Sequence, residues 1–522
     1  MLASALLALS LASAAEPPAI DAAPRRAIWI SLADKAVPKG GVRPEHTPLE
    51  PRALARRAQR RTASGLVDAR DLPIDPARVA SILSTGATYR AQSRWLNGVS
   101  VEASDAELRR IMRLPFVRTA WNLHHTIKGA ELPEPPLDAE GSVAGGDYGY
   151  MQAQLGQIAI PSLHARGLHG EGMVIGVLDT GFRQVHEAFH SAEHPLEVIA
   201  QWDFVSNDGN TDIEANDHPE QHKHGTWILG TLGAFKPGAA VGSAYGARFV
   251  LAKTEVYATE TVVEEDYYVA GLEFIEAHGA DLATSSLGYI DWYAPSDLDG
   301  ETAITTIAVN IATANGLVCL TAAGNQGHDS DPATNRLLAP ADAFSVIACG
   351  AADVNGATAS FTSDGPSADG RVKPEVMACG VAVASVHSTN TTGYQAVSGT
   401  SLSTPLVAGA AALVLQARPD YGVASLRTAL FETASGFLAN GTHDPLFIRG
   451  YGVIDARAAA LRGRAPEDLD LDGDVSAADL ARLLAAWGPC ADPDPLTGAC
   501  PADFDGDGSV GASDLARLLA AW

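Results

Sequence analysis

The chain has 522 residues, which is too long for one typical domain and predicts several folded units. It is 46% hydrophobic with 50 glycines and 30 prolines, as expected of a globular, loop-rich protein, and its formal net charge is −26. Because a basic patch is needed to displace the counterions of nucleic acid, this charge argues against a nucleic-acid-binding protein.

The first 145 residues hold two segments of different character. Residues 1–15 are a short apolar run followed by small residues, similar to a secretory signal peptide without the usual basic start. No later apolar run reaches the ~20 uncharged residues that span a bilayer. We therefore expect a secreted or cell-surface-associated protein without a transmembrane segment. In residues 16–145, "WLNGVSVEA" predicts a strand and "SDAELRRIMRLP" a short helix, which favours a small α+β domain before a Pro/Gly/acid-rich linker.

Residues 146–463 alternate between strand and helix patterns. The runs "MVIGVLD", "RFVLAKT", "GLVCLTAAG" and "FSVIACGA" are continuously apolar, as expected for parallel strands that are covered on both faces. Helical stretches such as "DYYVAGLEFIEAHG" and "AITTIAVNIATANG" lie between them. This alternation predicts an α/β domain with a parallel sheet, in which active residues follow the carboxyl ends of the strands.

Four residues of this block are candidates for nucleophilic catalysis. Ser401 lies on a Gly-bearing turn before an apolar helix, His224 opens another helical run, and Asp179 ends a buried strand. Asn325 follows a strand through Ala-Ala-Gly, where small residues leave room for a substrate. A serine nucleophile needs a base, an acid that orients the base and a donor to the oxyanion. Taken singly, Ser401 is equally typical of a helix cap, and the other three residues are typical of surface or turn positions. His222 is a second candidate for the base beside His224.

In this order the four positions resemble the subtilisin-like serine peptidases, or subtilases. The matching blocks are "VLDTG" at Asp179, "HGT" at His224, "AAGN" at Asn325 and "GTSLSTP" at Ser401. The resemblance covers residues 146–463 and implies a subtilisin-like fold and serine endopeptidase activity without a catalytic cofactor. It implies that Ser401 attacks the peptide carbonyl, His224 transfers the proton, Asp179 orients His224, and Asn325 stabilises the oxyanion.

The same resemblance implies a substrate strand and a propeptide. "SSLG" is similar to the segment that pairs with an extended peptide substrate, so Ser286, Leu287 and Gly288 would offer backbone groups; ordinary sheet packing is the alternative. Residues 16–145 stand where subtilases carry a propeptide that assists folding and is removed by self-cleavage, here near residues 140–150. A permanent N-terminal domain is the alternative. For the whole chain, the alternative to an enzyme is a catalytically silent binding protein on the same scaffold.

Residues 464–522 form an acidic block with an internal repeat. "DLARLLAAW" occurs at 479–487 and again at 514–522, and an Asp-rich loop leads into each copy. The loops fit a calcium-binding pattern, with side-chain oxygens at positions 1, 3, 5 and 12, a Gly at position 6 and a backbone carbonyl at position 7. The predicted calcium ligands are Asp468, Asp470, Asp472, Asp474 and Asp479 in the first loop, and Asp503, Asp505, Asp507, Ser509 and Asp514 in the second.

Aspartate at position 12 and a helix after each loop resemble dockerin modules. That resemblance implies a cohesin-type protein partner, whereas a calcium-dependent stability element without a partner is the alternative. Cys490 and Cys500 flank the loop between the repeats and predict either a local disulfide or two free thiols. The other cysteines, Cys319, Cys349 and Cys379, lie in apolar runs and are expected to be buried.

Overall fold

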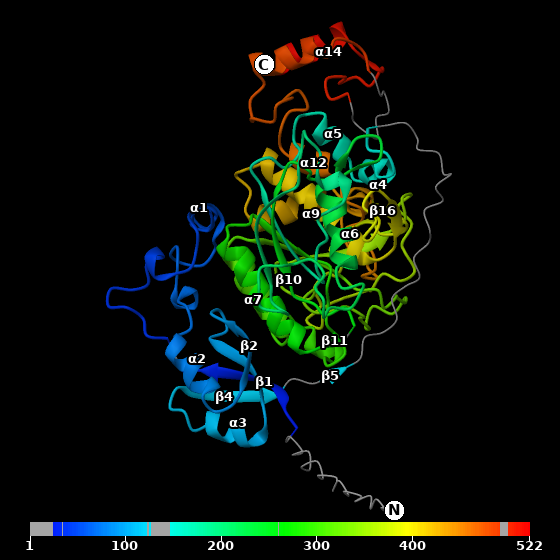
Figure 1. The fold of residues 1–522 in the computed structure, drawn as a ribbon. Helices are drawn as coiled ribbons and strands as arrows, with labels where there is room; N and C mark the ends of the chain where they lie inside the picture. Colours follow the sequence, from blue (N-terminus) through cyan, green and yellow to red (C-terminus); the bar gives the residue numbers. More distant parts are fainter. Residues whose placement is uncertain (1–23, 34, 123–124, 127–146, 259, 491–499) are drawn as a thin grey trace, which may run out of the picture.

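The structure is a computed structural model that describes residues 24–33, 35–122, 125–126, 147–258, 260–490 and 500–522. The predicted signal peptide and most of the predicted linker lie outside these residues. Figure 1 shows three parts in chain order, which we call the N-terminal unit (described residues up to 126), the central unit (147–463) and the C-terminal unit (464–522).

The central unit is built on a parallel sheet of seven strands, which confirms the predicted α/β fold. The strand order is β15-β14-β13-β12-β6-β10-β7, and every neighbouring pair is parallel. The strands are β6 (Val174–Asp179), β7 (Glu197–Asp203), β10 (Arg248–Lys253), β12 (Leu282–Ser285), β13 (Val318–Ala322), β14 (Ile347–Ala352) and β15 (Val376–Cys379).

Helices cover both faces of this sheet, which explains its continuously apolar strands. Val177 of β6 packs in a core cluster with residues of α6 and α9, whereas the next residue, Leu178, packs with residues of α7 and α8. Figure 1 shows α7 on one side of the sheet and α6 and α9 on the other. These helices are α6 (Lys223–Gly233), α7 (Val263–Ala277), α8 (Ile304–Ala314) and α9 (Thr400–Ala417). The three cysteines predicted to be buried are buried free thiols.

Helix α9 is the central packing element of one face. By length and composition it would suffice to cross a membrane, but 94% of its apolar window is buried inside the protein. A helix that is apolar on all sides and enclosed by other elements is a core helix. The remaining elements of the central unit are α4 (Gln152–Gln157), α5 (Ile160–His164), β8 (Phe235–Lys236), β9 (Ala240–Val241), β11 (Glu260–Thr261), β16 (Val383–Val386), β17 (Tyr394–Val397), α10 (Val423–Glu432), α11 (Ser435–Asn440) and α12 (Ala456–Leu461).

The N-terminal unit contains a four-stranded antiparallel sheet in the order β2-β3-β1-β4. The helices Pro76–Leu83 and Asp105–Ile111 pack against this sheet, whereas the helix Pro51–Arg60 packs against the end of α7. As predicted, a strand leads into a short helix, and Ser104 caps that helix by accepting a hydrogen bond from Glu107 N–H. The strands are β1 (Arg26–Leu32), β2 (Thr88–Ser93), β3 (Gly98–Ala103) and β4 (Val117–Asn122), and the helices are α1 (Pro51–Arg60), α2 (Pro76–Leu83) and α3 (Asp105–Ile111). After β4, the two-residue strand β5 (His125–Thr126) pairs with β11, just before α7.

The C-terminal unit consists of two loop–helix repeats, α13 (Ala477–Ala485) and α14 (Ala512–Ala521), which share a small apolar core. The short strands β18 (Gly488–Pro489) and β19 (Ser509–Val510) pair between the repeats. Cys490 and Cys500 form a disulfide. Of the two predicted alternatives, a local disulfide or two free thiols, the first is therefore confirmed.

Candidate active site

Asp179 and His224 meet at the carboxyl end of β6. Asp179 is the fully buried last residue of the strand, and its Oδ1 lies 2.8 Å from His224 Nδ1 in the first turn of α6. The close contact between the start of α6 and the turn after β6 requires glycine at position 225, because a Cβ there would lie 2.2 Å from the Gly181 carbonyl oxygen. Since the carboxylate only accepts, Nδ1 carries the proton and Nε2 keeps a lone pair, as a general base requires.

Thr180 fixes the Asp179 carboxylate in this position. Its backbone N–H and its hydroxyl both donate to Asp179 Oδ1, at 2.7 and 3.2 Å. The Thr180 hydroxyl also accepts a hydrogen bond of 3.3 Å from Gly225 N–H, which ties the end of β6 to the start of α6. The sequence predicted no role for Thr180 or Gly225, although both residues stand in the motifs "VLDTG" and "HGT", next to Asp179 and His224.

His222 does not compete with His224 for the role of base. It is buried, and its Nε2 is hydrogen-bonded to the Ser388 carbonyl oxygen at 3.2 Å. Burial lowers the pKa of His222 below its usual range. The structure therefore gives His222 a packing position and leaves His224 beside Asp179.

Ser401 is the second residue of α9 and is bonded to Ser286 by two hydrogen bonds. The Ser286 hydroxyl donates to the Ser401 carbonyl oxygen at 2.7 Å, and the Ser401 hydroxyl donates to the Ser286 carbonyl oxygen at 3.3 Å. Within the described part of the chain, no hydrogen bond joins the Ser401 hydroxyl to His224. A rotation about the Ser401 Cα–Cβ bond is therefore expected when a substrate binds, as is common for catalytic groups in free enzymes.

Asn325 is exposed, yet its side chain is held in one orientation. Its Oδ1 accepts from the Thr400 N–H at 2.9 Å and from the Thr400 hydroxyl at 3.0 Å, which leaves the Nδ2 hydrogens for another acceptor. A Cβ at Gly399 would lie 3.5 Å from Asn325 Nδ2 and 3.6 Å from Ser401 N, so both donors border the same small space. The N-terminus of α9 adds its positive end there, which suits a developing negative charge.

The segment Ser286–Gly288 continues from β12 past Ser401. Ser286 and Leu287 are almost fully buried, and the Leu287 carbonyl oxygen accepts from the Thr321 hydroxyl at 3.5 Å. Gly288 makes no backbone hydrogen bond to any described residue. A backbone that lies beside the predicted nucleophile with unpaired groups suits an extended peptide.

Both acidic loops of the C-terminal unit fold in the same way. Asp479 Oδ1 accepts from Leu469 N–H at 2.7 Å, and Asp514 Oδ1 accepts from Phe504 N–H at the same distance. Carboxylate oxygens from positions 1, 3 and 12 lie within 4.8 Å of one another in each loop, in the groups Asp468, Asp470, Asp479 and Asp503, Asp505, Asp514. The side chains of the position-5 residues, Asp472 and Asp507, instead accept from the N–H groups of position 7, Asp474 and Ser509.

One buried oxygen in the first loop supports a cation site. Asp468 is 1% exposed, and its Oδ1 has no hydrogen-bond partner among the described residues. An unpaired carboxylate oxygen is costly to bury, and oxygen-only ligands suit a hard cation such as calcium. The donor set of these loops therefore fits the calcium predicted from the sequence.

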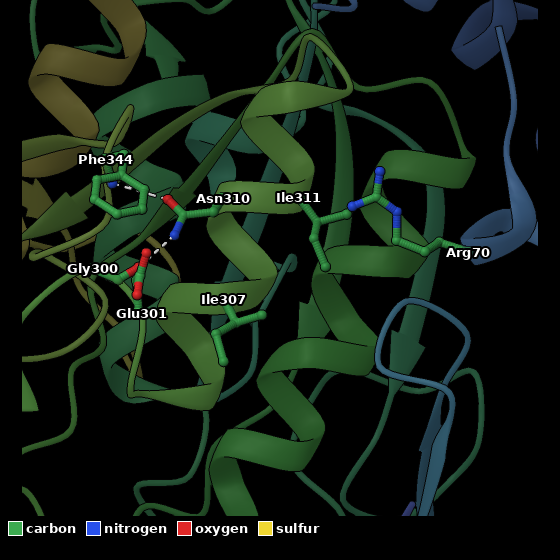
Figure 2. Close-up of a pocket in the computed structure, with 7 residues that line it drawn as sticks. All are labelled: Arg70, Gly300, Glu301, Ile307, Asn310, Ile311 and Phe344. Atoms are coloured by element: carbon green, nitrogen blue, oxygen red, sulfur yellow. Dashed lines mark hydrogen bonds between the residues drawn. The ribbon is translucent and has the colours of Figure 1, made fainter. Parts of the chain in front are cut away.

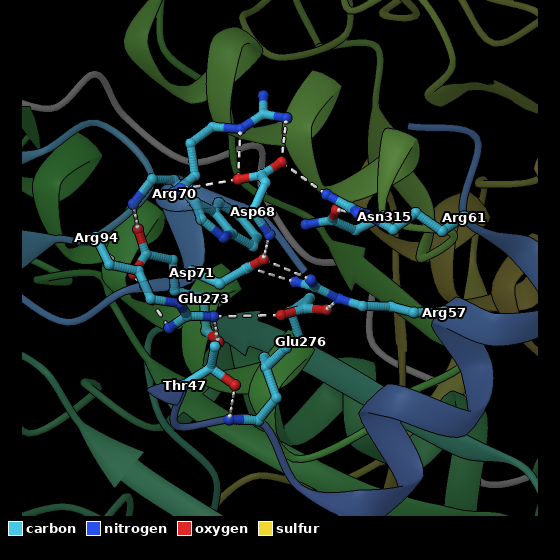
Figure 3. A network of polar contacts seen from close by, with 12 residues as sticks. Thr47, Arg57, Arg61, Asp68, Arg70, Asp71, Arg94, Glu273, Glu276 and Asn315 are labelled. Atoms are coloured by element: carbon cyan, nitrogen blue, oxygen red, sulfur yellow. Dashed lines mark hydrogen bonds and ion pairs between the residues drawn. The ribbon is translucent and has the colours of Figure 1, made fainter. Parts of the chain in front are cut away.

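The N-terminal unit covers α7 with a network of buried ion pairs (Figure 3). Arg57 pairs with Asp71 of its own unit and with Glu276 of α7, at 2.7 and 2.8 Å. Arg94 pairs with Glu273 and Glu276 at 3.2 Å each. Burial raises the pKa of Glu276, but Arg56, Arg57 and Arg94 together bring it below its usual range.

A cavity of about 270 Å³ lies where the N-terminal unit meets α8 (Figure 2). Its lining residues are Arg70, Gly300, Glu301, Ile307, Asn310, Ile311 and Phe344. None of the catalytic candidates lines it, and Asn310 already bonds to the Gly300 carbonyl and the Phe344 N–H. The cavity therefore belongs to the contact between two units and not to the candidate active site.

Two family profiles match the chain. The profile described as "Subtilase family" matches residues 170–452, and "Peptidase S8 propeptide domain, Bacteroidota" matches residues 27–135. Subtilisin DY of Bacillus licheniformis is 34% identical over 309 residues, which cover 58% of this chain and 96% of that protein. Subtilisin E of Bacillus subtilis (strain 168) is 32% identical over 312 residues, or 59% of this chain and 70% of that protein.

A solved structure has the same fold. Fervidolysin from Fervidobacterium pennivorans, a keratinolytic enzyme related to subtilisin, superposes with a TM-score of 0.54 at 20% identity. The match covers 84% of this chain and 61% of the fervidolysin chain. At this identity the likeness is evidence for the fold alone.

Proposed function

Because the chain belongs to the subtilase family of serine peptidases, we propose that Ser401, His224, Asp179 and Asn325 are its catalytic residues. The protein is a serine endopeptidase with an N-terminal propeptide domain. The observation that carries the residue assignment is the 2.8 Å hydrogen bond between buried Asp179 and His224, at the end of β6 where parallel-sheet enzymes place their chemistry.

The proposed reaction uses each of the four residues once per half-reaction. Ser401 Oγ bonds to the carbonyl carbon while His224 Nε2 takes its proton, and the buried Asp179 carboxylate stabilises the imidazolium. The carbonyl oxygen becomes an oxyanion that accepts from Asn325 Nδ2 and Ser401 N–H. The C–N bond then breaks as His224 protonates the leaving nitrogen, which leaves an ester on Ser401. In the second half-reaction a water molecule attacks the ester carbonyl while His224 takes a proton from it. His224 then returns the proton to Ser401 Oγ as the C–O bond breaks, and the carboxylic acid product leaves.

We propose that the substrate binds as an extended strand along Ser286, Leu287 and Gly288. The unpaired backbone of Gly288 and the proximity of Ser286 to Ser401 support this role. In this arrangement the peptide is held by backbone hydrogen bonds, and its side chains meet pockets on alternate sides. Protein and peptide substrates are therefore expected, and secretion follows from the signal-like residues 1–15.

A fluorophosphonate tests the residue assignment, because it reacts only with an activated serine. We expect peptide mass spectrometry of the processed protein to place the label on Ser401, and His224→Ala to abolish labelling. His218→Ala serves as a matched control, because His218 is an exposed histidine outside the proposed site and should leave labelling intact. A folded, processed chain that takes up no label would support the catalytically silent binding protein instead.

We propose four segments: a signal peptide (1–15), a propeptide with linker (16–145), a catalytic domain (146–463) and a dockerin-like calcium module (464–522). The profile matches at 27–135 and 170–452 fall within the second and third of them. In the last segment Leu483 and Leu518 are buried in the core of the unit, while their neighbours Leu484 and Leu519 are about half exposed. This repeated apolar exposure, together with Trp487 and Trp522, supports docking of a cohesin-type partner.

Calcium would be held by the ten predicted loop residues and would neutralise their clustered carboxylates. We expect chelation to lower the unfolding temperature and to release the apolar helices from their shared core. At 100 times the dissociation constant, calcium would stabilise the folded state by about 2.7 kcal/mol. Calorimetry with and without a chelator measures this shift. Asp479→Asn should reduce the shift in unfolding temperature that the chelator causes. Asp420→Asn, a change at an exposed aspartate outside the loops, should leave that shift unchanged. An unfolding temperature that is the same with and without chelator would contradict the calcium assignment.

A further inference from the structure

Two backbone segments flank the proposed nucleophile, and we call the space between them the slot. The first is Ser286–Gly288, which touches Ser401 through the 3.3 Å hydrogen bond from the Ser401 hydroxyl to Ser286. The second is Ala323–Asn325, which is tied to the same turn by the 2.9 Å bond from Thr400 N–H to Asn325 Oδ1. Because both segments are bonded to the turn that carries Ser401, the slot between them opens at the nucleophile.

Both walls present a glycine, and both glycines face the same side chain. A Cβ on Gly288 would lie 2.6 Å from the Leu338 Cβ, and a Cβ on Gly324 would lie 2.8 Å from the Leu338 Cγ. The isobutyl group of Leu338 therefore occupies the space that the two missing side chains leave between the walls. Leu338 is only partly buried, so part of the residue is accessible to solvent.

The backbone holds Leu338 against both walls. Its N–H donates to the Ala323 carbonyl oxygen at 3.1 Å, and the next residue, Ala339, exchanges two hydrogen bonds of 2.9 Å with Tyr289. The wall at Gly324 favours glycine, because its φ is +122° and a Cβ there would also lie 2.6 Å from Ser363 Oγ. Leu338 therefore forms the floor of the slot, and backbone hydrogen bonds tie its segment to both walls.

From this arrangement we infer that Leu338 fills the pocket for the side chain on the acyl side of the scissile bond and limits that residue to glycine, alanine or serine. The inference rests on the proposed function. When the carbonyl carbon lies at Ser401, the Cα of the same residue is one bond away, and its side chain enters the slot between the walls. A small side chain fits above Leu338, whereas a phenyl ring requires the isobutyl group to move.

Two peptide anilides test this, with alanine and phenylalanine as the acyl residue in otherwise equal peptides. We expect the wild-type protein to favour the alanyl substrate at least 10-fold in kcat/KM, because a phenyl ring exceeds the single methylene that already costs about 10-fold or more in an apolar pocket. Leu338→Ala should shift the ratio towards phenylalanine at least 10-fold. The matched control is Leu438→Ala, the same change at a leucine that is 67% exposed, and it should leave the ratio unchanged.

A measurement on the wild-type protein keeps the inference testable even where Leu338→Ala does not fold. Digestion of a denatured protein, followed by mass spectrometry, should yield new carboxyl termini that are dominated by small residues. A protein that is able to take up the fluorophosphonate but, unlabelled, cleaves after large residues would overturn the inference alone, as would an unchanged ratio in folded Leu338→Ala. A chain that neither takes up the label nor cleaves either anilide would overturn the proposed function.

Discussion

Purified Ser401→Ala protein should remain one uncut polypeptide, with the N-terminal unit still attached. Self-cleavage uses the same nucleophile as substrate cleavage, and Ser401 is the only residue to which we assign that role. On peptide substrates the loss in kcat should be about 10⁶-fold, the size recorded for removal of the corresponding serine in subtilisin itself. Gel electrophoresis and N-terminal sequencing of wild-type and variant proteins measure processing directly.

Ser398→Ala is the matched control for that experiment. Ser398 lies three residues earlier, and its hydroxyl accepts a 2.9 Å hydrogen bond from Ala382 N–H, so it serves the local turn. We expect this variant to be processed as the wild type is. Release of the N-terminal unit by purified Ser401→Ala protein would assign the cleavage to another group and would contradict the proposed nucleophile.

The sequence predicted the catalytic candidates because each of them is specified locally. Asp179 follows a long apolar strand, and His224 and Ser401 each lie in the first turn of a helix, so short motifs carry their positions. Two strands have weaker hydrophobic patterns in the sequence. β12 spans only four residues, which is too short for a pattern to be recognised, and β7 lies at the edge of the sheet, where most of its side chains are not buried.

Contacts between segments that lie far apart in the chain could not be predicted from the sequence. Arg57 meets Glu276 across 219 residues, and nothing near either residue indicates its partner. Leu338 likewise looks like an ordinary leucine, and it gains its position only because its segment crosses between Gly288 and Gly324. The motifs thus located the chemistry, while the pocket and the propeptide contact depend on tertiary packing.

The affinity of the cleaved N-terminal unit for the central unit should fall as pH rises from about 4 to about 7. Asp266 of α7 is buried beneath this unit and accepts a hydrogen bond from Ser100, and burial raises the pKa of Asp266 to about 7. Among the residues that the structure describes, its Oδ1 has no hydrogen-bond partner, and Arg90 is the cation that acts on it. Glu273, which contacts Ser93 and Arg94, is also buried with a raised pKa.

The sign follows from the two states of Asp266. Released from the complex, the carboxyl returns towards its usual pKa of 3.8, so below that pH it is protonated in both states and binding is strongest. Between this value and about 7 Asp266 must hold in the complex a proton that it has lost in the free central unit. For Asp266 alone, this weakens binding about tenfold per pH unit, up to about 10³-fold. Above about 7 Asp266 adds no further change. Glu276 acts in the opposite direction, but its window lies below its usual value of 4.5.

Processed protein with its serine blocked by fluorophosphonate permits this measurement without digestion of the released unit. Size-exclusion chromatography at pH 5, 6, 7 and 8 separates bound from free N-terminal unit. Asp266→Asn is the matched control, because its amide stays neutral and should keep binding tight and reduce the slope to what Glu273 supplies. If the wild-type dissociation constant is constant over this range, or the variant keeps the full slope, then Asp266 does not bind the proton on association, and retention of the unit rests on the arginine network alone.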